Sequence, residues 1–152
     1  MSTVRPPRSD RDMEKLMERL IAAAKAARGN AYAPYSGYRV GAAFATKSGK
    51  IFAGCNVENA SYGACLCAER NAIAQMIAAG EHAPTACAVV TAGPKAGSPC
   101  GICRQVMGEF ARDMPVALVG VSGARETRRD TTLATLLPDA FGAASLAPRT
   151  KG

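Results

Sequence analysis

Two short segments of the chain carry side chains that can bind a metal ion and move protons. The first, "CLCAER", holds Cys67 and Glu69, and the second, "SPCGICRQ", holds Cys100 and Cys103. Residues three apart lie on one helical face, so the sulfurs of Cys100 and Cys103 can converge on one ion. Such a pair occurs in zinc sites, in thioredoxin-type redox centres and by coincidence, and two thiols alone do not choose among these.

Cys67 is the candidate for a third metal ligand. A catalytic zinc site has three protein ligands and leaves the fourth position for water. Cys67 stands 33 residues before Cys100, far enough for two helix starts to face each other, and a helix N-terminus favours thiolate over thiol. Within a regular helix Cys67 and Glu69 would point about 200° apart. We therefore expect the helix to begin at Leu66 or Cys67, so that both side chains can share one site.

Positive charge is expected beside these ligands, because three thiolates on one zinc ion leave a net charge of −1. Arg70 directly follows Glu69, and Arg104 directly follows Cys103. The alternative for each arginine is an ordinary solvated position on a helix. We predict that Arg70 donates hydrogen bonds to the thiolates and supports the metal site from outside it.

The other three cysteines need a different explanation. Cys65 lies two residues before Cys67 and competes with it as a ligand, but no glutamate stands two positions after Cys65. Cys55 and Cys87 fall within apolar segments, so we predict that they are small buried side chains. Three cysteines are thus expected to bind zinc and three to play no part in the site.

The pattern of apolar residues predicts the elements that position these side chains. Apolar spacings of three and four indicate an amphipathic helix over residues 13–27, and two apolar runs around a tight turn indicate a hairpin over about 38–58. "ACAVVTA" and "PVALVGV" are continuously apolar, which is typical of strands covered on both faces. Further helices are expected from 66 or 67 to 80 and over 103–111, a strand near 125–129, and helical turns over 131–141.

These elements predict an α/β fold, a three-layer α/β/α sandwich built on one mixed sheet of about five strands. A chain of 152 residues has the length of one domain. We expect a single catalytic domain over residues 13–147, a flexible Arg/Pro-rich N-terminal tail over 1–12, and a C-terminal tail over 148–152.

Composition limits the compartment and the partners. The first residues lack the apolar segment of a secretory signal, and no run of about 18 apolar residues predicts a membrane span. We therefore expect a cytoplasmic protein, where six cysteines serve better as ligands or buried thiols than as disulfides. Much of the net charge of +7 lies in the tails and in "GARETRRD", where acidic residues interrupt it, so we expect no nucleic-acid partner.

The two cysteine segments together resemble the signature of the zinc nucleobase deaminases, in which a glutamate that is not a ligand moves protons. The chain is similar to the small homotetrameric cytidine deaminases with three zinc-binding cysteines. The likeness extends over "YAPYSGYRVGAA", "GCNVENASYG", "CLCAER", "SPCGICRQ" and "LLPDAF". It implies a cytidine deaminase-like fold, one Zn²⁺ per subunit on Cys67, Cys100 and Cys103, and Glu69 as the proton shuttle.

The implied reaction is hydrolytic deamination of free cytidine and 2′-deoxycytidine to uridine and 2′-deoxyuridine plus ammonia, a step of pyrimidine salvage. In the resembled family, residues matching Asn56 and Glu58 hydrogen-bond the ribose 3′-hydroxyl. Residues two apart on a strand share a face, so both side chains can reach one sugar. A carboxylate at position 58 would repel a 3′-phosphate, which favours a free nucleoside over a nucleotide or a nucleic-acid strand.

The resemblance also implies contacts around the base. Tyr38 would lie against it and Ala68 would join the binding site, while Tyr62 would reach the 5′-hydroxyl and Phe141 the base, each from a neighbouring subunit. Many relatives have Phe where Tyr38 stands and Pro where Arg39 stands, so the packing of the base departs from the family pattern here.

Three alternatives remain at this point. A blasticidin-type nucleoside antibiotic deaminase shares the cysteine and glutamate pattern, although the "NVEN" block favours cytidine. A binding module with a structural zinc is the second, with Cys65 closing the fourth coordination position. A nucleic-acid editor is the third, and its binding would weaken steeply with salt.

Overall fold

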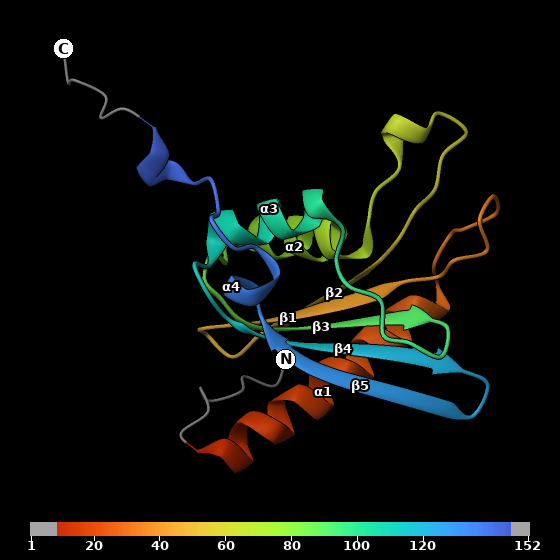
Figure 1. Cartoon of the computed structure of the whole chain (residues 1–152), viewed down its shortest axis with the longest axis horizontal. Helices are drawn as coiled ribbons and strands as arrows, with labels where there is room; N and C mark the ends of the chain where they lie inside the picture. Colours follow the sequence, from red (N-terminus) through yellow and green to blue (C-terminus); the bar gives the residue numbers. More distant parts are fainter. Residues whose placement is uncertain (1–8, 147–152) are drawn as a thin grey trace.

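A computed structural model describes residues 9–146 and shows a sheet with helices on both faces (Figure 1). The strands are β1 (Gly41–Thr46), β2 (Ile51–Cys55), β3 (Pro84–Ala92), β4 (Pro115–Ser122) and β5 (Arg125–Thr132). The helices are α1 (Asp10–Gly29), α2 (Ala68–Ala78), α3 (Gly101–Phe110) and α4 (Leu133–Leu136), with 3-10 turns η1 (Tyr62–Ala64) and η2 (Ala143–Ser145). The predicted tails cover residues 1–12 and 148–152. Residues 1–8 and 148–152 of these tails lie outside the described residues.

The sheet is mixed, with the strand order β2-β1-β3-β4-β5. β3 and β4 run parallel, and every other pair of neighbours runs antiparallel. The two continuously apolar segments form this parallel pair, as expected for strands covered on both faces. α1 lies on one side of the sheet and α2 and α3 on the other (Figure 1), so the predicted three-layer fold is confirmed.

Alternate side chains of the strands enter two separate cores. The apolar stripe of α1 packs on small side chains of the sheet, namely Ala43, Ala45, Ala86, Ala88, Val90, Ala117 and Val119. The face toward α2 and α3 presents Ala42, Phe44, Cys87, Val89, Val116 and Leu118. Because a slip of one residue would exchange these two sets, burial on both faces fixes the register of the strands.

The N-terminal helix begins at Asp10, three residues before the predicted start. Ser9 caps it, since its side-chain oxygen accepts a hydrogen bond from the backbone N–H of Asp12 at 3.2 Å. None of the helices within residues 9–146 is long and apolar enough to cross a membrane.

The hairpin is shorter than the predicted range of about 38–58, because its second strand ends at Cys55. Beyond this point Val57 leaves β1 and forms isolated bridges with Tyr32 and Leu66 instead. The segment that follows, around η1, projects away from the sheet (Figure 1).

Candidate active site

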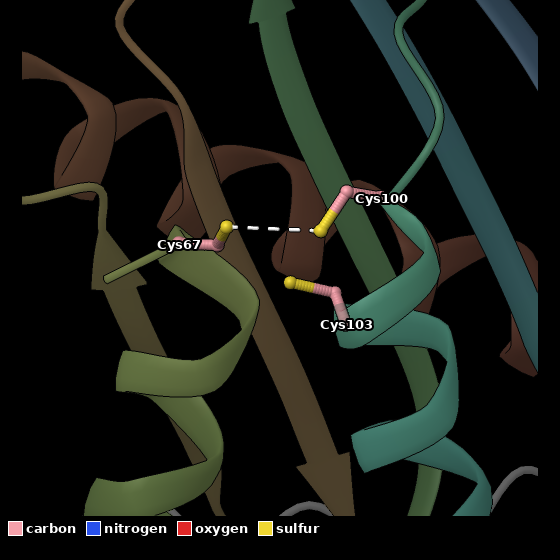
Figure 2. Close-up of side chains that lie close together, drawn as sticks. All are labelled: Cys67, Cys100 and Cys103. Atoms are coloured by element: carbon pink, nitrogen blue, oxygen red, sulfur yellow. Dashed lines mark hydrogen bonds between the residues drawn. The ribbon is translucent and has the colours of Figure 1, made fainter. Parts of the chain in front are cut away.

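Two helix N-termini bring three cysteines together. Cys67 is the N-cap of α2, Cys100 is the N-cap of α3, and Cys103 lies in the first turn of α3. The three sulfurs lie within 4.8 Å of one another, with 3.9 Å between those of Cys67 and Cys100. Figure 2 shows the side chains pointing toward a common centre. Three converging thiols are a donor set that zinc prefers, so the site fits this metal.

Cap geometry allows Cys67 and Glu69 to share the site. α2 begins at Ala68, just after the predicted start at Leu66 or Cys67, and Cys67 has extended backbone angles of φ −75° and ψ 154°. The sulfur of Cys67 is therefore free of the helical spacing that would separate it from Glu69. Cys100 has the same kind of extended conformation before α3, with φ −67° and ψ 167°.

Glu69 is a buried acid beside the three sulfurs. Its side chain is only 4% exposed, and its Oε2 lies 3.5 Å from the donating sulfur of Cys103. Burial, and next the nearby Cys67 thiolate, raises the pKa of Glu69 above its usual value. A buried carboxyl group with a raised pKa beside a metal-binding cluster is a candidate for proton transfer in catalysis.

Arg70 lies where positive charge was expected. Its Nη2 donates to the sulfur of Cys67 at 3.8 Å and to the carbonyl oxygen of Cys65 at 3.0 Å. Hydrogen bonding with Cys103, and next with Arg70, lowers the pKa of Cys67 to about 5, while the bond with Cys67 raises the pKa of Cys103. Arg104 turns elsewhere, since its guanidinium donates to the backbone oxygens of Pro99 and Leu136.

A cavity of about 250 Å³ opens beside the cysteines. The predicted residues that line it are Tyr38, Asn56, Glu58, Cys67, Ala68, Glu69 and Cys100. Thr91 and Ser98 also line it, and the sequence offered no signal for them beyond the place of Ser98 two residues before Cys100. The structure thus brings together residues from β3, the two cysteine segments and the "NVEN" block.

The expected strand at Asn56 and Glu58 is wrong, because β2 ends at Cys55 and both residues reach the cavity from irregular backbone beyond it. The Asn56 amide is fixed at both ends, since its Nδ2 donates to the Tyr38 carbonyl oxygen and its Oδ1 accepts from the Val40 N–H, both at 2.8 Å. Glu58 accepts hydrogen bonds from the turn that contains Ser36, which hold the pKa of its carboxyl group below the usual value.

Tyr62 and Phe141 do not line this cavity within the single chain. Tyr62 is 78% exposed and borders an adjoining hollow that it shares with Glu58. Phe141 is 61% exposed and borders a third hollow, together with residues of α3 and α4. Their predicted contribution to a neighbouring subunit stays a prediction.

The three remaining cysteines lie apart from the sulfur cluster. Cys65 points to the backbone of Asn59, accepting from its N–H at 3.3 Å and donating to its oxygen at 3.6 Å. Cys87 is fully buried, which raises the pKa of its thiol well above the usual value. Cys55 is only partly buried, because its strand β2 lies at the edge of the sheet.

A model of one protein family matches residues 11–118, and its description is "Cytidine and deoxycytidylate deaminase zinc-binding region". The chain belongs to this family. It is 48% identical over 128 residues to a cytidine deaminase of Sporosarcina psychrophila, covering 82% of this chain and 90% of that protein. A cytidine deaminase of Halalkalibacterium halodurans is 43% identical over 125 residues, covering 82% and 92% of the two chains.

Solved structures agree with these relatives. The crystal structure of a cytidine deaminase from Burkholderia pseudomallei superposes with a TM-score of 0.76 at 51% identity, over 82% of this chain and 98% of that one. That of a cytidine deaminase from Mycobacterium tuberculosis gives a TM-score of 0.68 at 38% identity, over 83% and 97%.

Proposed function

We propose that the protein deaminates free cytidine and 2′-deoxycytidine by hydrolysis, releasing ammonia. The observation that carries this proposal is the position of Glu69, a buried carboxyl group beside three converging sulfurs at the wall of a cavity. Relatives that are 48% and 43% identical to this chain and named cytidine deaminase support the choice of substrate.

Cys67, Cys100 and Cys103 would hold one zinc ion per subunit. When bound, the ion supplies a Lewis acid that lowers the pKa of a water molecule at its open position. Arg70 offsets part of the negative charge of the thiolates, because its Nη2 lies 3.8 Å from the sulfur of Cys67. The partial positive charge of two helix N-termini acts in the same direction.

Glu69 would carry the protons of the reaction. It accepts one from the attacking water and passes it to the ring nitrogen beside the reacting carbon, where uridine keeps it. It then takes the second proton of the water and gives it to the leaving amine, which departs as ammonia. The pKa of Glu69, which burial raises above its usual value, makes the carboxylate a stronger proton acceptor than an exposed glutamate.

Asn56 and Glu58 would select the nucleoside through its 3′-hydroxyl. A negative charge on Glu58 would repel a phosphate at the 3′ position, which favours a free nucleoside over a 3′-nucleotide or a nucleic-acid strand. Tyr38 and Ala68 would contact the base, since both line the cavity. Tyr62 and Phe141 would complete the site of a neighbouring subunit in a homotetramer. The enzyme would act in the cytoplasm, in pyrimidine salvage.

The test is incubation of zinc-loaded protein with cytidine, 2′-deoxycytidine, cytidine 3′-phosphate and blasticidin S in parallel. We expect loss of cytidine absorbance with formation of uridine and ammonia, comparable turnover of 2′-deoxycytidine, and little turnover of the phosphate. Faster reaction of blasticidin S than of cytidine would overturn the proposed substrate. Light scattering on the same sample measures the oligomeric state.

A further inference from the structure

A turn preceding β1 encloses the carboxylate of Glu58. The backbone N–H groups of Tyr35 and Ser36 donate to Oε2 of Glu58, at 2.9 and 3.2 Å, and the hydroxyl of Ser36 donates to Oε1. The turn itself is closed by a hydrogen bond of 3.0 Å from the N–H of Gly37 to the carbonyl oxygen of Ala33. Gly37 has φ +67°, a left-handed conformation that glycine adopts at little cost.

These bonds leave little of the carboxylate free. Each carboxylate oxygen has about two acceptor positions. Two N–H groups fill those of Oε2, and the hydroxyl of Ser36 fills one of those of Oε1. Glu58 therefore keeps one acceptor position, on Oε1, for a hydroxyl group of a substrate.

The hydroxyl of Ser36 is itself oriented by the turn. The backbone N–H of Tyr38 donates to its Oγ at 3.0 Å, which directs the hydroxyl hydrogen toward Glu58. The backbone of Glu58 is held as well, because its N–H donates to the carbonyl oxygen of Tyr32 at 2.8 Å. Both ends of the Glu58 side chain are thus fixed by the same stretch of chain.

Ser36 acts from the side away from the nucleoside cavity. Glu58 borders both the cavity beside the cysteines and the adjoining hollow. Ser36 borders the adjoining hollow but does not line the cavity. A residue in this place touches Glu58 but not the proposed substrate. Its influence on the reaction would pass through the orientation of the carboxylate alone.

We propose that Ser36 is a positioning residue, which turns the single free acceptor of Glu58 toward the sugar and makes the enzyme select nucleosides with a 3′-hydroxyl. The proposal rests on the proposed function of the site. A fixed acceptor gains more from a correctly placed hydroxyl than a mobile one, because the ordering cost is met before binding. It also gives nothing to a sugar that lacks the hydroxyl, which is the basis of selection.

The test compares cytidine with 3′-deoxycytidine on wild type, Ser36→Ala and Ser36→Thr. Without the hydrogen bond from Ser36 the ordering of the Glu58 side chain falls on substrate binding, which should raise KM for cytidine roughly 2- to 10-fold in Ser36→Ala. We expect kcat for cytidine to stay within about twofold, because the contact of Glu58 with the 3′-hydroxyl binds the substrate and the transition state equally. Both constants for 3′-deoxycytidine should also stay within about twofold, because that sugar has no 3′-hydroxyl for the carboxylate to bind. Ser36→Thr keeps the hydroxyl and should restore most of the selectivity. Ser122→Ala, at the exposed end of β4, is the matched control.

The outcomes separate this proposal from the proposed function. Equal losses on both nucleosides in Ser36→Ala would mean that Ser36 only supports the fold, and no loss on either would mean that Glu58 needs no positioning. Either result, with an active wild type, overturns the role of Ser36 alone. A wild type that does not deaminate cytidine overturns the proposed function and this role with it.

Discussion

Gly54→Ala should disturb the site by displacing α2, the helix that carries Glu69 and is capped by Cys67. A methyl group at position 54 of β2 would lie 2.6 Å from the backbone nitrogen of Ala72 and 2.9 Å from the backbone oxygen of Ala68, both in α2. Ordinary contact begins at 3.4 Å, so the helix and the strand must separate by about 0.8 Å. Neither contact atom belongs to a flexible side chain, and the strain cannot be relieved by a change of rotamer.

The separation should lower both stability and turnover. Overpacking of this kind costs about 1–3 kcal/mol, out of roughly 5–15 kcal/mol for a typical domain, so the variant should still fold. The same shift moves the start of α2, and with it Cys67 and Glu69, relative to the cysteines of α3. A misplacement near 1 Å at a catalytic centre lowers the rate up to about 100-fold.

The assay is a thermal melt together with zinc content and kcat for cytidine. We expect Tm to fall by about 2–4 °C for each kcal/mol lost, and kcat to fall at least roughly tenfold. Gly63→Ala is the matched control, because a methyl group there would have nothing within 4 Å. If Gly54→Ala matched Gly63→Ala in both Tm and kcat, the argument from close packing would be refuted.

Two further predictions concern the metal and an ion pair. Cys67→Ser should lose most of its zinc to a chelator that the wild type resists, whereas Cys65→Ser should keep its zinc. Loss of zinc from Cys65→Ser would instead favour a structural site with four sulfur ligands. Hydrogen bonding to Arg128 lowers the pKa of Glu14 below its usual value of 4.5. The ion pair therefore stabilises the fold at pH values above 4.5. This stabilisation is lost as the pH falls through the lowered pKa and Glu14 becomes protonated. The difference in Tm between wild type and Glu14→Gln should therefore be present at neutral pH and vanish in acid, and a difference that persists in acid would contradict the assignment.

Much of the fold was predictable because two periodic patterns are strong in this sequence. The continuous apolar runs of β3 and β4 and the stripe of α1 indicated a covered sheet, and the structure has it. The ends of the elements were less predictable, since they depend on local hydrogen bonds. Ser9 starts α1 early, and Val57 leaves the hairpin to pair with other segments.

The site, too, has residues that the sequence indicated and residues that it did not. Spacing indicated Cys67, Cys100 and Cys103, because few side chains bind metals and their intervals constrain the geometry. Ser36 gave no signal, since its role depends on a contact with Glu58 that only folding creates. Adjacency to a ligand was also a weak guide, because Arg70 lies at the sulfurs whereas Arg104 holds backbone oxygens.

The most direct test of the account is the turnover of cytidine by zinc-loaded Glu69→Gln. The substitution keeps the size of the side chain but removes its ability to carry a proton. We predict full zinc content, an unchanged fold and a loss of kcat of at least about 100-fold. Glu109→Gln, exposed on α3, should keep wild-type turnover as the control. Nearly full activity in Glu69→Gln at full zinc content would contradict the account.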